Sequence, residues 1–159
     1  MSTSTAPRTV QLPSARVLVG GVYAVCVLAQ LGVHTGDIVL TDKDPYHSEG
    51  PVESIIAISI FGTAALVIGV GLLLLLARTP AGARVGSFLL LALAVVTVVF
   101  FWSGAPGIFG ACAAASAGLT RGGRPLAGSA RVAGIIGAFF AMLNLVLTIG
   151  GLVLTPLIG

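Results

Sequence analysis

Long apolar runs, separated only by short polar segments, constrain this chain more than any other feature of its sequence. A helix needs about 20 apolar residues to cross the hydrocarbon core of a bilayer, and each of the clearest runs is close to that length. The sequence therefore predicts an all-α fold, a polytopic membrane helical bundle in contact with lipid. The clearest runs are residues 15–33, 52–77, 85–102 and 132–154.

The composition excludes a soluble domain. Hydrophobic residues make up 57% of the 159 residues and charged residues only 8%, which leaves too few charges for a polar surface. The formal net charge of +3 comes mainly from arginines in short loops, which indicates membrane topology rather than contact with nucleic acid. We expect one bundle over residues 15–159, with the lipid bilayer as its partner and no nucleic acid. The richness in Ala, Gly, Val and Arg is typical of a GC-rich bacterium and suggests a bacterial inner membrane.

The first residues, 1–14, are polar and show no periodicity, and Arg8 and Arg16 flank the following apolar run. Such a segment predicts a disordered cytoplasmic tail. A signal peptide cleaved after Ala29 is an alternative, because a basic flank and an apolar stretch precede that site. The apolar run continues to Val33 and further spans follow, so an uncleaved first helix is the favoured interpretation.

The charges of the loops predict how the chain is threaded. The first loop, residues 35–51, carries Asp42, Asp44 and Glu49 against a single lysine, and we expect it outside the cell. The next loop, residues 78–84, holds two arginines in a turn with Pro and Gly. The positive-inside rule places that loop in the cytoplasm.

Residues 85–120 are too long for one span and are followed by a strongly basic loop. Their middle, residues 103–107, is a Gly and Pro turn signal preceded by three aromatic residues typical of a membrane interface. We predict a tight hairpin, out along 85–102 and back along 106–120. The bundle then has five transmembrane helices, a cytoplasmic amino terminus and an extracytoplasmic carboxyl terminus. The alternative has four helices, with 85–120 as one bent or re-entrant element and the next arginines outside.

The returning segment consists almost entirely of small side chains. Gly110, Ala114 and Gly118 recur at every fourth position and form a stripe that lets another helix approach closely. Because helices in lipid associate through van der Waals contact, the stripe predicts a helix at the centre of the bundle. A dimerisation seam, and with it a homo-oligomer, is the alternative to packing within one chain.

Few polar side chains are expected at membrane depth. Asn144 and Thr63 are predicted at one depth, where they could form a hydrogen bond across the bundle. The same reasoning brings Gln30, Ser59 and Thr97 together in the outer third. We interpret these residues as contacts between helices rather than as substrate ligands.

Ionisable residues predict no metal site, cofactor or catalytic centre. Glu53 is expected to interact with the dipole at the start of the second helix rather than to couple transport. Cys26 and Cys112 lie in apolar runs and form no C-x-x-C pair. No nucleophile and base, paired carboxylates or zinc motif fall at membrane depth, so we expect no enzyme. The outer segment does hold potential metal ligands, in an order that fits no calcium loop: His34, Asp37, Asp42, Asp44, His47 and Glu49.

Two functional hypotheses remain. The first is a non-enzymatic accessory or scaffold bundle that recognises a membrane protein partner through its outer loop or its small-residue helix. The second is a small oligomeric transporter or channel, and the first is favoured because no ionisable group is expected at the midplane. The polar path of such a transporter would be lined by Gln30, Ser59, Thr97 and Asn144.

Overall fold

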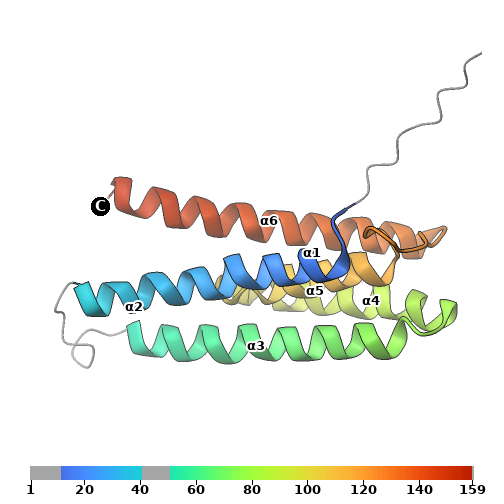
Figure 1. Ribbon diagram of the computed structural model, residues 1–159, viewed down its shortest axis with the longest axis horizontal. Helices are drawn as coiled ribbons and strands as arrows, with labels where there is room; N and C mark the ends of the chain where they lie inside the picture. Colours follow the sequence, from blue (N-terminus) through green and yellow to red (C-terminus); the bar gives the residue numbers. More distant parts are fainter. Residues whose placement is uncertain (1–11, 41–50, 159) are drawn as a thin grey trace, which may run out of the picture.

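The computed structural model describes residues 12–40 and 51–158, and the regular elements in this part are helices (Figure 1). In chain order they are α1 (Ala15–Tyr23), the π-helical segment η1 (Ala24–Ala29), α2 (Gln30–Leu40), α3 (Pro51–Leu76), α4 (Pro80–Val96), the 3₁₀ segment η2 (Thr97–Ser103), α5 (Ala105–Ser116) and α6 (Ser129–Ile158). Since α1, η1 and α2 form one rod and α4 continues into η2, the described part of the chain has five helices. The first rod extends to Leu40, although a loop was expected from residue 35.

Four of these helices are long and apolar enough to cross a membrane: Ala15–Gly36, Val52–Leu76, Pro80–Ser103 and Ser129–Val153. Their outward faces carry large apolar side chains, such as Leu74, which is 63% exposed. Water would hydrate such surfaces poorly, whereas lipid accommodates them. The fifth helix, α5, has 12 residues and is about 18 Å long, shorter than the hydrocarbon core of a bilayer.

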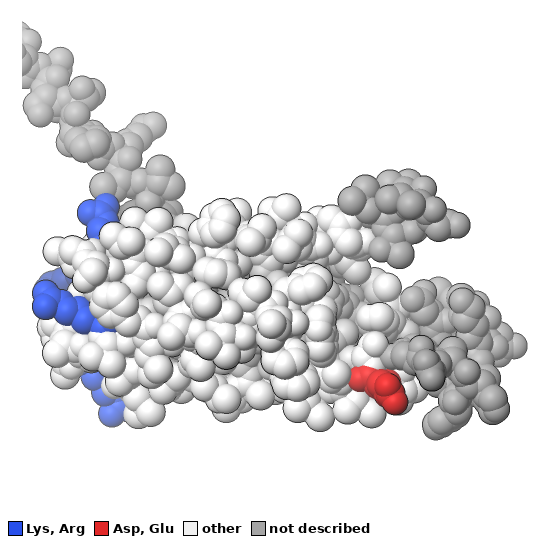
Figure 2. All heavy atoms as spheres, turned by 180° about the vertical axis from the view of Figure 1, so that it is seen from behind, with Lys and Arg blue, Asp and Glu red and all other residues white. Residues whose placement is uncertain are grey.

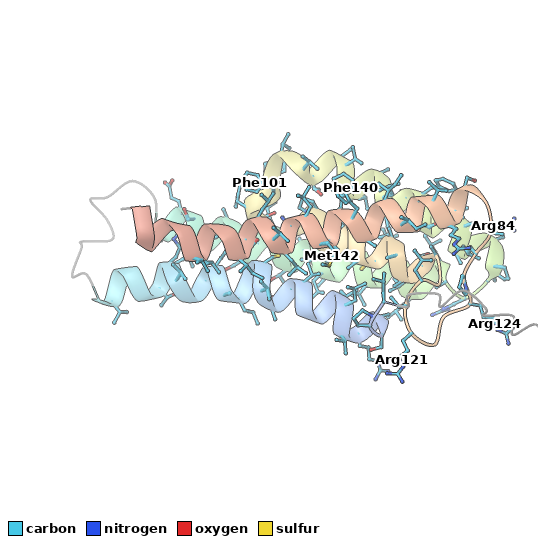
Figure 3. All side chains as sticks on the ribbon, turned by 90° about the horizontal axis from the view of Figure 1, so that it is seen from above. Arg84, Phe101, Arg121, Arg124, Phe140 and Met142 are labelled. Atoms are coloured by element: carbon cyan, nitrogen blue, oxygen red, sulfur yellow. The ribbon has the colours of Figure 1, made fainter. Side chains whose placement is uncertain are left out.

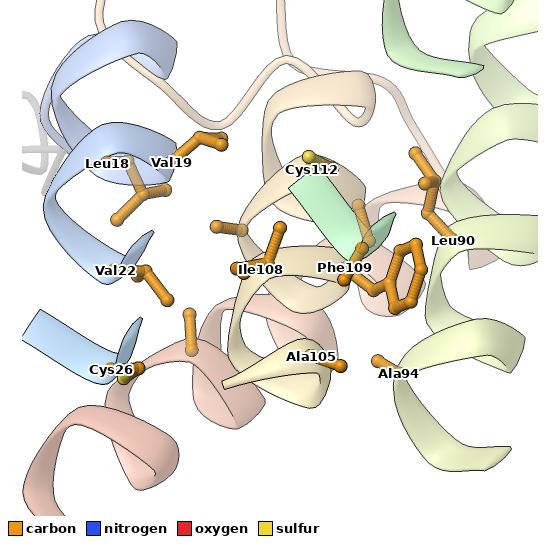
Figure 4. Packing of buried hydrophobic residues seen from close by; sticks show 14 of the residues in the cluster. Leu18, Val19, Val22, Cys26, Leu90, Ala94, Ala105, Ile108, Phe109 and Cys112 are labelled. Atoms are coloured by element: carbon orange, nitrogen blue, oxygen red, sulfur yellow. The ribbon is translucent and has the colours of Figure 1, made fainter. Parts of the chain in front are cut away.

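The short helix α5 lies at the centre of the bundle, as predicted. All of its residues from Ala105 to Ala114 are buried, and it contacts α1, α3, α4 and α6. Figure 4 shows Ile108 and Cys112 of this helix among side chains of the surrounding rods. Gly110 allows a close approach of α6, because a Cβ atom there would collide with the carbonyl oxygen of Gly137. The small side chains therefore serve packing within the chain.

Gly118 does not belong to this stripe, because α5 ends before it. The residue has a φ of +72°, and the N–H of Leu119 donates to the carbonyl of Ala114 at 3.1 Å. The N–H of Gly118 donates to the carbonyl of Ala115 at 3.0 Å. These are the two hydrogen bonds of a Schellman motif, which requires a left-handed residue after the helix. Gly118 is thus a helix terminator, and the expectation that it lines a helix face is wrong.

The described arginines gather at one end of the bundle. Figure 3 labels Arg84, Arg121 and Arg124 at this end, and the basic side chains visible in Figure 2 lie there as well. We call it the arginine end. The carboxyl-terminal end of α6 and the start of α3 lie at the opposite end (Figure 1). The four-helix alternative would have placed Arg121 and Arg124 at that opposite end.

Helices α4 and α5 form the predicted hairpin, but its tip, Ser103 and Gly104, lies inside the bundle rather than at its surface. A Cβ atom on Gly104, whose φ is +76°, would lie 2.8 Å from Cys26 Cβ in η1. Ser103 is fully buried, and its carbonyl oxygen approaches Gly62 near the middle of α3. The hairpin turns inside the bundle because its first arm ends in the tighter 3₁₀ segment η2. Within η2, the backbone of Phe100 departs from helical geometry (φ −109°, ψ 35°).

Candidate functional site

A cavity of about 680 Å³ lies above the hairpin tip, in the half of the bundle away from the arginine end. Of the described helices, three continue past the tip: the rod formed by α1, η1 and α2, the helix α3, and the helix α6. No fourth described helix fills the space between them. We call this space the tip cavity. It is lined by Gln30, Val33 and His34 of α2, Ser54 and Ile58 of α3, Phe101 and Trp102 of η2, and Leu147, Thr148, Gly151 and Leu152 of α6.

Aromatic side chains of η2 form the floor of the tip cavity. Phe100 stacks on Phe61 of α3 with ring centroids 5.2 Å apart, and Trp102 meets Phe61 edge-on at 6.0 Å. Such pairs fix ring orientation beyond simple burial of area. The aromatic cluster was expected at a membrane interface. It instead anchors the hairpin tip to the middle of α3.

The walls of the tip cavity are apolar with a few hydrogen-bonding groups. Thr148 is buried, and its Oγ1 donates to the Sγ of Cys26 at 3.5 Å. The side chains of Gln30, His34 and Ser54 are half-buried and make no hydrogen bond to another residue of the described segments. None of the described lining residues is Asp, Glu, Lys or Arg.

Asn144 fastens the hairpin tip to α6. The residue is 3% exposed, and its Nδ2 donates to the carbonyl oxygen of Phe101 at 2.9 Å. The predicted hydrogen bond to Thr63 is wrong, because Thr63 Oγ1 lies 3.2 Å from the hydroxyl of Tyr23 instead. Counting residues along two helices gives their depth but not the direction each side chain faces. Thr63 points outward, whereas Asn144 points at the tip.

A smaller cavity of about 290 Å³ lies between η2 and α6, and we call it the side cavity. Its lining is apolar except for Asn144, whose Oδ1 is buried without a hydrogen-bond partner. Phe101 and Leu147 line both cavities and so form the partition between them. The full lining is Val98, Phe101, Pro106, Phe140, Leu143, Asn144 and Leu147.

The other polar residues that were predicted to lie together do not form one cluster. Ser59 Oγ donates to the carbonyl of Ile55 at 2.7 Å, and Thr97 Oγ1 donates to that of Leu93 at 2.7 Å. A hydroxyl in an apolar helix is commonly satisfied by the carbonyl one turn earlier. Of the predicted group, Gln30 alone lines the tip cavity. The expected clustering of these side chains in the outer third is therefore not observed.

The charged candidates lie outside the described residues or near the end of the bundle opposite the arginine end, which we call the open end. Glu53 is exposed in the first turn of α3, the position expected for an interaction with the helix dipole. Asp42, Asp44 and Glu49 fall outside the described residues. Within residues 12–40 and 51–158, no group of three or more His, Cys, Asp or Glu could hold a metal ion.

Comparison with protein-family models, curated proteins and solved structures finds no match to this chain. The site is therefore defined by its geometry alone. Sequence reasoning missed the tip cavity, including Thr148 in its wall and Trp102 in its floor. The signal that could have revealed it is the short length of the returning helix, which leaves one half of the bundle with fewer helices.

Proposed function

We propose that this chain is a multi-pass membrane protein that acts as a non-enzymatic accessory bundle and binds its ligand or partner in the tip cavity. The observation that carries the proposal is a cavity of about 680 Å³ with apolar walls and a few hydrogen-bonding groups. Ligand sites in proteins have this composition, and their volumes commonly fall between about 300 and 1,000 Å³.

Close packing of the other half of the bundle favours binding over transport. Ile108, Ala111 and Cys112 of α5 are fully buried beneath the hairpin tip. A translocation path through one chain would have to cross this core. The small oligomeric transporter, the alternative, would need a path between chains, and the separated positions of Ser59 and Thr97 offer no polar lining for it.

The charge distribution supports an orientation with the arginine end in the cytoplasm. Short basic loops stay on the cytoplasmic side of a membrane. The amino terminus is then cytoplasmic, whereas the carboxyl terminus and the tip cavity face the extracytoplasmic side. The cavity occupies the half of the bundle that lies in the outer leaflet.

Purification of the full chain from native membranes tests the proposed function. Gly151→Leu should fill the tip cavity, because a Cβ atom at Gly151 would meet nothing within 4 Å. Gly150→Leu is the matched control, since its Cβ also meets nothing within 4 Å and Gly150 is not part of the cavity lining. We expect a lipid or protein that co-purifies with the wild type and the control but is depleted from Gly151→Leu. Equal recovery with all three chains would contradict a binding role for the cavity.

A further inference from the structure

We propose that the ligand of the tip cavity is an uncharged amphiphile of the outer leaflet, with its hydrocarbon chain against Phe101 and Leu147. Its hydrogen-bonding head group lies near His34 and Ser54. This inference rests on the proposed function and names the chemical class of the ligand. Depth, polarity, charge and lateral access each support it.

The depth of the tip cavity matches one leaflet. Its floor, Trp102, belongs to the hairpin whose tip lies beside Gly62, near the middle of α3. A cavity that begins at mid-bundle can extend for only about half of the 30 Å hydrocarbon core. A partner helix that crosses the membrane would need a groove along the whole bundle, and this floor blocks such a groove. A lipid-like molecule requires only one leaflet.

Hydrogen-bonding side chains reach the mouth of the tip cavity. His34 lies one turn beyond Gln30 on α2, towards the open end, and Ser54 lies one turn beyond Ile58 on α3. The floor is aromatic. A head group at the mouth can therefore form hydrogen bonds, while burial of a hydrocarbon chain at the floor removes apolar surface from water.

The absence of charge in the described lining selects an uncharged head group. A buried ion needs a partner of opposite charge, because otherwise it loses its hydration without compensation. The described arginines lie at the other end of the bundle (Figure 2).

The side cavity gives the hydrocarbon chain a lateral route. It shares Phe101 and Leu147 with the tip cavity, and the Leu147 side chain is half exposed on the outer face of α6. Displacement of these two side chains would let a hydrocarbon chain pass between η2 and α6 into the surrounding lipid. Figure 3 shows Phe101 and Phe140, both in the side cavity lining, on neighbouring elements.

Fluorescence of Trp102 tests this inference directly, because Trp102 is the only tryptophan of the chain and lines the cavity floor. The full chain is reconstituted in phosphatidylcholine vesicles and titrated with a monoacylglycerol whose acyl chain carries bromine atoms, which quench a tryptophan in contact. We expect a saturable loss of fluorescence with the wild type and with Gly150→Leu. With Gly151→Leu, and with a lysophosphatidate that bears the same brominated chain, the saturable component should be lost.

Three outcomes would overturn the inference. Quenching of the wild type that never saturates would show only contact with bulk lipid. Equal saturable quenching of Gly151→Leu would place the amphiphile outside the cavity, and equal quenching by the anionic analogue would refute the choice of head group. If the purification experiment yields a cavity-dependent protein while the titration shows no saturable quenching, the amphiphile is refuted and the proposed binding function stands.

Discussion

Because Gly107 has no side chain, Asn144 can lie close to the hairpin tip. A Cβ atom on Gly107 would lie 2.7 Å from Asn144 Oδ1 and 3.0 Å from Val22 Cγ1. The amide oxygen therefore lies against the backbone of α5, where a Cα–H group is a weak donor. The amide nitrogen meanwhile binds the carbonyl of Phe101 at 2.9 Å. One side chain on α6 thus contacts both arms of the hairpin.

Replacement of Asn144 by leucine should destabilise the bundle by about 0.6 to 2 kcal/mol, the range for polar contacts between membrane helices. The change removes the donor that binds Phe101 O. Thermal unfolding in detergent measures the loss, and Val146→Leu serves as a control because Val146 is 61% exposed on the same helix. Equal stability of the two variants would show that the amide does not hold the tip.

At the scale of elements, the central position of α5 depends on its small residues. Gly110 faces the carbonyl of Gly137, and in turn a Cβ on Gly137 would lie 2.8 Å from Ala113 Cβ. The two helix backbones approach each other here. Such contact replaces the hydrophobic drive that is weak between helices in lipid.

Larger residues at this crossing should separate the two helices. Gly110→Leu or Ala114→Leu is expected to cost about 1 to 3 kcal/mol through overpacking. The lipid-facing change Leu74→Ile should leave stability nearly unchanged. The yield of folded protein and the unfolding temperature in detergent compare the three variants, and similar losses in all of them would remove the case for a close crossing.

The sequence predicted the central helix and the turn because both depend on local residue types. Small side chains along the returning segment permit close packing, and Gly104 supplies a left-handed turn. The depth of that turn depends on how η2 bends at Phe100, which no local pattern encodes. The predicted hydrogen bond between Asn144 and Thr63 was wrong for a related reason, since the direction that a side chain faces is set by the packing of whole helices. The tip cavity exists because the hairpin turns deep inside the bundle, so it was not predicted from the sequence either.

At the scale of the whole molecule, charge divides the bundle along its length. The described arginines mark one end, and Glu53 lies in the first turn of α3 at the other (Figures 1 and 2). No described acidic residue pairs with an arginine across this distance. The positive-inside rule acts on the arginines, and on this basis we propose that the arginine end faces the cytoplasm.

Single cysteines test this direction in intact cells. In a chain with Cys26 and Cys112 replaced by alanine, a membrane-impermeant maleimide should label Thr35→Cys but not Ala127→Cys. Both positions are exposed, Thr35 towards the open end of α2 and Ala127 in the basic loop before α6. Ser103 is unsuitable as an outer probe, because it is fully buried at the tip. Labelling of Ala127→Cys from outside would reverse the proposed orientation.

The half-length of α5 also governs how the chain can be assembled. A helix of 12 residues, about 18 Å long, is too short to enter a bilayer as an independent span. Three of its neighbours, α1, α3 and α4, are synthesised before it, but α6 is synthesised after it. Until α6 leaves the ribosome, the face of α5 that carries Gly110 has no helix packed against it. Helix α6 therefore closes a core that is encoded earlier in the sequence, and the bundle is complete only once α6 has been synthesised.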